Sequence, residues 1–264
     1  MVDRIYVTFD SNVLPQFINC ENKEDTSRDV KLLRHIQNCK IIPYICEIAI
    51  TLESITNDER ADFWENYQPN YDFDEEIAPT GKIEAKISMG PSPKKHPGLP
   101  KPRMMALEKA VELNFKLLCM TNVGTVRCNE IPGELYESVD ESFHEYAEYL
   151  AKFSNYVTSQ GWGRSWYDNF CKKYNINGVL EAPKKIPESE RGNFSKAIAE
   201  WVDGDSLAAH YASGNKYFCT SDQGGEAGSQ SVFYPDNLRS LEQTFGIEVV
   251  TPEQLLTKLS TENS

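Results

Sequence analysis

The sequence predicts an α/β fold with a mostly parallel central sheet and a helical insertion between the two parts of its core. Short β-rich runs alternate with helical stretches at both ends of the 264-residue chain. This alternation is typical of a parallel sheet that carries helices on its faces. Polar turn residues follow two of the runs directly, and the alternation is absent between about residues 60 and 195.

The N-terminal part predicts two strand–helix units. A β-rich run over residues 5–9 ends in the polar tripeptide 10–12, which indicates a strand followed by a loop. A second strand is expected over residues 40–45. The stretch 46–55 that follows has closely spaced apolar residues and is expected to form a buried helix.

The C-terminal part repeats this pattern. Asp205 heads a helical stretch over residues 206–213, and Gly214 stops that stretch in the manner usual for a helix C-terminus. A strand is expected over residues 216–220. Further elements are expected to be a helix over 235–245, a strand over 246–250 and a helix that starts at Pro252 after the cap residue Thr251.

The core is therefore expected to comprise residues 1–60 and 195–264, with residues 61–194 as a mainly helical insertion. Helical periodicity within the insertion is found over 104–119, 139–156 and 165–174. The proline-rich segment from about residue 80 to 103 predicts an exposed loop, because so many prolines cannot lie in an uninterrupted helix.

The charge of the chain excludes one class of function. The formal net charge is −13, so most of the surface repels phosphate backbones, and binding of nucleic acid over the whole surface is excluded. The proline-rich loop is locally basic, and it is expected either to contact RNA or to be a solvated linker. The RNA-contact candidates are Lys82, Lys86, Lys94, Lys95, Lys101 and Arg103.

Targeting signals are not evident in the sequence. No apolar run approaches the roughly 18 residues of a membrane span, and the N-terminus lacks the pattern of a signal peptide. Seven widely spaced cysteines show no zinc-site spacing. We therefore expect a cytoplasmic protein with reduced thiols and no membrane partner, and a homo-oligomer is compatible with the sequence.

Several acids lie near the expected strand ends and helix starts. Asp10 and Asp222 each come just after a strand, and ligands of open parallel sheets bind beyond the carboxyl ends of the strands. The other acids of this kind are Glu47, Glu53, Asp203 and Asp205. Clustered carboxylates repel one another and commonly bind divalent cations, and oxygen ligands favour Mg²⁺ or Mn²⁺. Such ions can activate water and clamp a scissile phosphate.

Five strings together resemble the PIN-domain nucleases. They are residues 6–14, 46–55, 205–210, 217–222 and 246–253. The resemblance covers about half of the chain, and its specificity comes from the ordered combination of the strings. It implies a PIN-like three-layer sandwich around a central parallel sheet.

The resemblance also implies a set of functional residues. The catalytic acids and metal ligands would be Asp10, Glu53, Asp205 and Asp222, with Ser11 or Asn12 and Thr220 or Ser221 in support. Apart from the resemblance, Glu47 and Asp203 are supporting candidates by their position, and Asp203 is otherwise a solvated neighbour. Glu47 and Glu53 are about 240° apart around a helix, so they cannot share one face. The string over residues 51–55 favours Glu53, and Glu47 remains the alternative.

The function expected from these residues is a Mg²⁺- or Mn²⁺-dependent endoribonuclease. The resemblance implies products with a 5′-phosphate and a 3′-hydroxyl, and it admits a toxin role with a cognate antitoxin. One alternative is a catalytically inactive PIN-like scaffold that binds a basic partner protein through its acidic surface. A haloacid-dehalogenase-type phosphatase is disfavoured, because Asn12 stands where that family needs a second aspartate after Asp10.

Overall fold

The centre of the molecule is a five-stranded parallel sheet with the order β5-β2-β1-β6-β7. The computed structural model describes residues 4–18, 20, 27–56, 59–60, 63, 70–77, 83–90, 96–120, 126, 128–136, 143–174, 187–224 and 228–261. The strands of the sheet are β1 (Ile5–Phe9), β2 (Ile41–Cys46), β5 (Lys116–Leu118), β6 (Tyr217–Cys219) and β7 (Glu248–Val250). The predicted α/β class and the predicted parallel sheet are confirmed.

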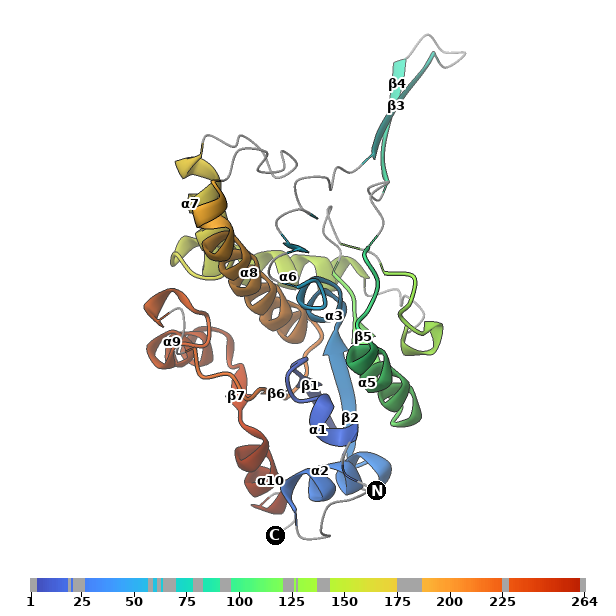
Figure 1. Cartoon of the computed structure of the whole chain (residues 1–264), viewed down its shortest axis with the longest axis vertical. Coiled ribbons are helices and arrows are strands. Elements are labelled where there is room, and N and C mark those ends of the chain that lie inside the picture. The colour runs from blue at the N-terminus through green and yellow to red at the C-terminus, as the bar shows by residue number, and fades with distance from the viewer. Residues whose placement is uncertain are drawn as a thin grey trace.

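Helices cover both faces of this sheet (Figure 1). They are α1 (Pro15–Ile18), α2 (Arg28–Gln37), α3 (Glu47–Glu53), α5 (Lys101–Glu112), α6 (Phe143–Ser159), α7 (Arg164–Lys173), α8 (Arg191–Ala212), α9 (Pro235–Phe245) and α10 (Pro252–Thr261). Side chains alternate between the two faces of a strand, so the apolar core is split into two clusters. One cluster joins α1, α2, α5 and α10 to the face that carries Phe9. The other joins α3, α6, α7, α8 and α9 to the face that carries Phe218.

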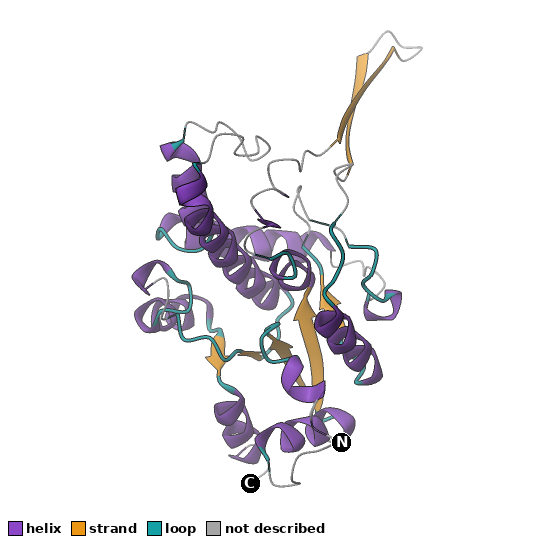
Figure 2. Ribbon diagram, in the orientation of Figure 1, coloured by secondary structure: helices purple, strands orange, loops and turns teal. Residues whose placement is uncertain are grey.

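An antiparallel hairpin lies apart from the central sheet. Its strands are β3 (Asn70–Ile77) and β4 (Ile83–Gly90), and Figures 1 and 2 show that it projects from the body of the molecule. The sequence prediction of an acidic stretch and an exposed loop did not include these strands. The available signal was the alternation of apolar residues, Tyr71 with Phe73 in one strand and Ile83 with Ala85 and Ile87 in the other.

The prediction of one helix over residues 104–119 was wrong at its C-terminal end. Helix α5 ends at Glu112, and strand β5 pairs with β2. Asn114 separates the two elements with a φ of 56°, a left-handed conformation that asparagine tolerates better than most residues. A strand of the core sheet therefore comes from the segment that was expected to be a helical insertion.

The expected helix start at Asp205 was also wrong. Helix α8 begins at Arg191, so Asp205 lies deep inside a 22-residue helix instead of at its N-cap. Gly204 does not break this helix, because it lies where α8 passes closely by the start of α7. A Cβ atom on Gly204 would be 3.4 Å from the Cα of Gly163. The glycine thus serves helix packing.

Other boundaries agree closely with the sequence prediction. Helix α9 spans the predicted residues 235–245, and α10 starts at the predicted Pro252. Helix α3 occupies the middle of the predicted helix over 46–55. None of the helices described here has the length and apolar character needed to cross a bilayer.

Candidate active site at the carboxyl edge of the sheet

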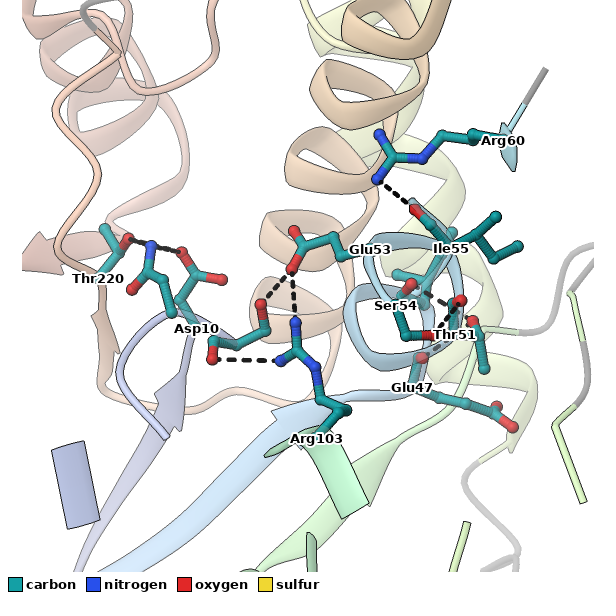
Figure 3. A network of polar contacts seen from close by, with 12 residues as sticks. Asp10, Glu47, Thr51, Glu53, Ser54, Ile55, Arg60, Arg103 and Thr220 are labelled. Atoms are coloured by element: carbon teal, nitrogen blue, oxygen red, sulfur yellow. Dashed lines mark hydrogen bonds and ion pairs between the residues drawn. The ribbon is translucent and has the colours of Figure 1, made fainter. Parts of the chain in front are cut away.

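Parallel pairing of the two central strands brings Asp10 and Thr220 together. Phe9 is paired with Cys219, and the Asp10 backbone N–H donates to the Cys219 carbonyl at 2.9 Å. The Thr220 hydroxyl donates to Oδ2 of Asp10 at 2.6 Å, and the Asn12 amide donates to the same oxygen at 2.8 Å (Figure 3). Asp10 is only 7% exposed, so these two donors fix a buried carboxylate at the end of β1.

The loop after β6 is tied to the same group. The backbone N–H of Ser221 donates to the Asn12 side-chain oxygen at 3.2 Å, and that of Asp222 donates to the Thr220 hydroxyl at 3.0 Å. The carboxylate of Asp222 accepts a hydrogen bond from the Gly224 N–H at 2.8 Å. Asp222 is exposed. The loop therefore holds an exposed acid beside the buried one.

Glu53 reaches the site from the last turn of α3. The Ser11 hydroxyl donates to Oε2 of Glu53, and the guanidinium of Arg103 lies 3.8 Å from that oxygen. Arg103 also donates to the Ser11 carbonyl at 3.3 Å. Figure 3 shows Glu53 and Arg103 beside Asp10. The basic residue that the sequence proposed as an RNA contact is thus part of the acidic site.

The two glutamates of α3 have separate environments. Glu47 is 1% exposed and accepts a hydrogen bond from the Tyr136 hydroxyl at 2.8 Å. Its carboxylate points away from Asp10 in Figure 3. Of the two alternatives that the sequence left open, the structure brings Glu53 to the strand ends and leaves Glu47 in a buried contact elsewhere.

Helix α8 contributes a different aspartate from the one that the resemblance implies. Burial, followed by the charges of acids that include Asp10, Glu53 and Asp222, raises the pKa of Asp203. Asp205 is about 200° further around the helix and accepts a hydrogen bond from the Trp201 indole N–H at 2.7 Å. The structure therefore brings Asp203 to the sheet edge and does not bring Asp205 there.

Burial and crowding raise the pKa values of the gathered acids. Burial raises the pKa of Asp10 and is the largest cause of its shift. Burial, followed by the charge of Asp10, raises the pKa of Glu53 to about 7, although Arg103 opposes the shift. The pKa of Asp203 lies well above its ordinary value for the same two kinds of reason. Burial is thus the largest cause of each shift, and the charge of a neighbouring acid adds to it.

Glu200 was missed in the sequence analysis. It lies one turn before Asp203 on α8, and its pKa is raised to about 7 by burial first and by the charge of Asp222. Its Oε2 atom is buried and has no hydrogen-bond partner among the described residues. The three-residue spacing from Asp203, which places two helix residues on one face, was the signal that could have found it.

The oxygen atoms that these side chains offer are chemically suited to a hard divalent cation. Carboxylate, hydroxyl and amide oxygens are the ligands that Mg²⁺ and Mn²⁺ prefer. Within the described part of the chain, no group of three or more His, Cys, Asp or Glu side chains has the spacing of a formed metal site. Contacts with Ser11 and Arg103 occupy Glu53. Both contacts go to Oε2, so Oε1 is the Glu53 oxygen that could bind an ion while they are kept.

The remaining basic candidates are spread along the chain. Lys101 is exposed at the start of α5, two residues before Arg103, and Lys86 belongs to β4. Lys82, Lys94 and Lys95 lie outside the described residues. The N-terminus of α5 is thus the described basic segment that borders the acidic site.

Comparison with known proteins gave no relative of this chain. No family model, no curated protein and no solved structure matches it. An account of its function therefore depends on the chemistry of the site and on the sequence strings described above.

Proposed function

We propose that this protein is a Mg²⁺- or Mn²⁺-dependent endoribonuclease of PIN type. The observation that supports this proposal best is the convergence of Asp10, Glu53, Asp203 and Asp222 beyond the carboxyl ends of the parallel strands. Gathering acids in this way destabilises the fold, since burial and neighbouring charges raise the pKa values of Asp10, Glu53 and Asp203. A function that needs a concentrated negative site accounts for this cost.

Each acid has a separate part in the proposed site. Asp10 is held rigidly by Thr220 and Asn12, so it would be the fixed ligand. Glu53 and Asp203 would complete the inner ligand set, and Asp222 would face the solvent side. An ion bound there would activate water and neutralise charge on the scissile phosphate.

An RNA strand must approach this acidic edge against the net charge of −13. The start of α5 offers the compensating charge, since Lys101 is exposed and the guanidinium of Arg103 lies within the site. Such a local basic rim next to buried acids suits a single-stranded or looped RNA, whose phosphodiester can enter a narrow site.

The test is cleavage of a pool of single-stranded and hairpin RNAs with Mn²⁺ and with EDTA. We expect Mn²⁺-dependent cleavage that Asp10→Asn and Asp222→Asn abolish. Asp236→Asn is the matched control, because Asp236 is an exposed acid paired with Arg239 on α9. Cleavage that survives both site variants would refute the assignment.

The ion pair between Arg103 and Glu53 favours a second candidate function. A guanidinium of the chain already neutralises part of the acidic site, as expected for a PIN-like scaffold that binds a partner protein and no metal. Calorimetric titration with Mn²⁺ distinguishes the two functions. Binding that Asp10→Asn removes supports the nuclease, and no binding by the folded wild-type protein supports the scaffold.

A further inference from the structure

A second polar site lies in the helical layer, on the side of α8 that carries Asp205. Residues of helices α6, α7 and α8 line a cavity of about 230 Å³ that is open to solvent on one side. Its polar lining includes Ser154, Thr158, Arg164, Asp168 and Asp205. The volume is below the 300–1,000 Å³ typical of sites for drug-sized molecules, so the cavity suits a small ligand.

The charges of this lining do not cancel. Asp168 and Asp205 are two acids, whereas Arg164 is the only base among the lining residues. Arg164 already pairs with Asp168 at 3.5 Å and lies 5.0 Å from the ring centre of Trp201. Asp205 is 5% exposed and has no ion-pair partner among the described residues, so above its pKa of about 7 one negative charge remains on it.

The hydrogen-bonding groups of the cavity also favour a ligand that donates hydrogen bonds. One oxygen of Asp205 accepts a hydrogen bond from the Trp201 indole, which leaves acceptor capacity on the carboxylate. The hydroxyl oxygen of Ser154 is buried and has no hydrogen-bond partner among the described residues. A ligand that donates a hydrogen bond would satisfy this unpaired hydroxyl oxygen.

We propose that this cavity binds a small organic cation with a primary ammonium group. An ammonium carries three donors and no acceptor, which matches the Asp205 carboxylate and the Ser154 and Thr158 hydroxyls. Val157 in the lining supplies apolar contact for an alkyl chain. A small anion would meet two acids and one guanidinium that is already paired, so the lining selects against it.

The test is calorimetric titration of the full chain with 1,4-diaminobutane at pH 8 and about 150 mM salt, with 1,4-butanediol as the uncharged analogue. Salt at this concentration screens the attraction between the diamine and the acidic surface of the protein and so weakens non-specific binding. We expect saturable binding of the diamine, no binding of the diol and at least a tenfold weaker affinity in Asp205→Asn. Asp236→Asn should bind as the wild type does, since Asp236 is an exposed acid elsewhere.

Ser154→Ala serves as a second variant if Asp205→Asn does not fold, and it should weaken binding several-fold. The proposal is wrong if the wild type shows no saturable binding, if the diol binds equally well, or if the folded variants keep the wild-type affinity. RNA cleavage does not enter this test, so its outcome is independent of the proposed nuclease function.

Discussion

The two faces of α8 place two aspartates in different chemical environments. Asp203 lies among other acids at the sheet edge, where like charges and burial raise its pKa. Asp205 lies in the helical layer, where burial raises its pKa to about 7 and the Trp201 indole and Arg164 oppose the shift. A separation of two residues thus decides which chemistry each carboxylate can serve, because it corresponds to about 200° around the helix.

The largest difference in activity is expected between the two variants in which one of these aspartates is replaced by asparagine. Asp203→Asn should lower Mn²⁺-dependent RNA cleavage by roughly 100-fold or more, because it removes a charged ligand from the proposed site. Asp205→Asn should leave the cleavage rate within about threefold, since its side chain faces the cavity. Single-turnover assays on both folded variants measure the difference. The reverse order of effects would return Asp205 to the active site.

The loop that holds Asp222 offers the next largest effect. A Cβ atom on Gly224 would lie 2.6 Å from backbone atoms of Phe233 and Tyr234, and the φ of Gly224 is +65°. Gly224→Ala should therefore reduce the free energy of unfolding by about 2–4 kcal/mol and lower cleavage by displacing Asp222.

Gly228→Ala is the matched control in the same connection. Gly228 has a φ of +58°, but a Cβ atom there would have no neighbour within 4 Å. It should cost only about 1 kcal/mol, the conformational part of the penalty. Urea unfolding of both variants measures the difference, and equal losses would show that the close approach at Gly224 is unimportant.

The acids with raised pKa values near the sheet edge predict a stability that falls as pH rises. Glu53 and Glu200 have an ordinary pKa of 4.5 and a folded pKa of about 7. The folded state binds more protons than the unfolded state between these values, so stability is greatest below the lower pKa and is lost as pH passes the higher one. We expect a loss of about 1–3 kcal/mol between pH 5.5 and 8 without metal.

Urea titrations at several pH values check this slope. Glu53→Gln should reduce it, because a neutral amide replaces one of the shifted groups. Mn²⁺ at pH 8 should restore part of the lost stability in the wild type and none of it in Asp10→Asn. A stability that is level or rises over this range would contradict the raised pKa values.

The smallest effect is expected at the other glutamate of α3. Glu47→Gln should keep the cleavage rate within about twofold, because the carboxylate points away from Asp10. It should cost about 1 kcal/mol or less in unfolding free energy, since the amide oxygen can still accept from Tyr136. Loss of cleavage in a stable Glu47→Gln variant would reopen the choice between the two glutamates.

Local sequence pattern was sufficient to predict most of the core elements in order, apart from β5, and the strand ends at which Asp10 and Asp222 lie. Alternating β-rich and helical runs follow from the burial of a parallel sheet on both faces, and polar residues at 10 and 222 follow from the strand ends. The rotation between Glu47 and Glu53 also came from sequence, because helix geometry is fixed.

Contacts between distant parts of the chain explain the features that the local sequence pattern did not predict. Strand β5 forms because residues Lys116–Leu118 pair with β2. Gly204 lies inside helix α8, at the point where the start of α7 packs closely against that helix. With the helix start moved to Arg191, the environment of each aspartate depends on which neighbours α8 faces. The exchange of Asp205 for Asp203, and the approach of Arg103 to Glu53, arise from contacts between residues far apart in the chain.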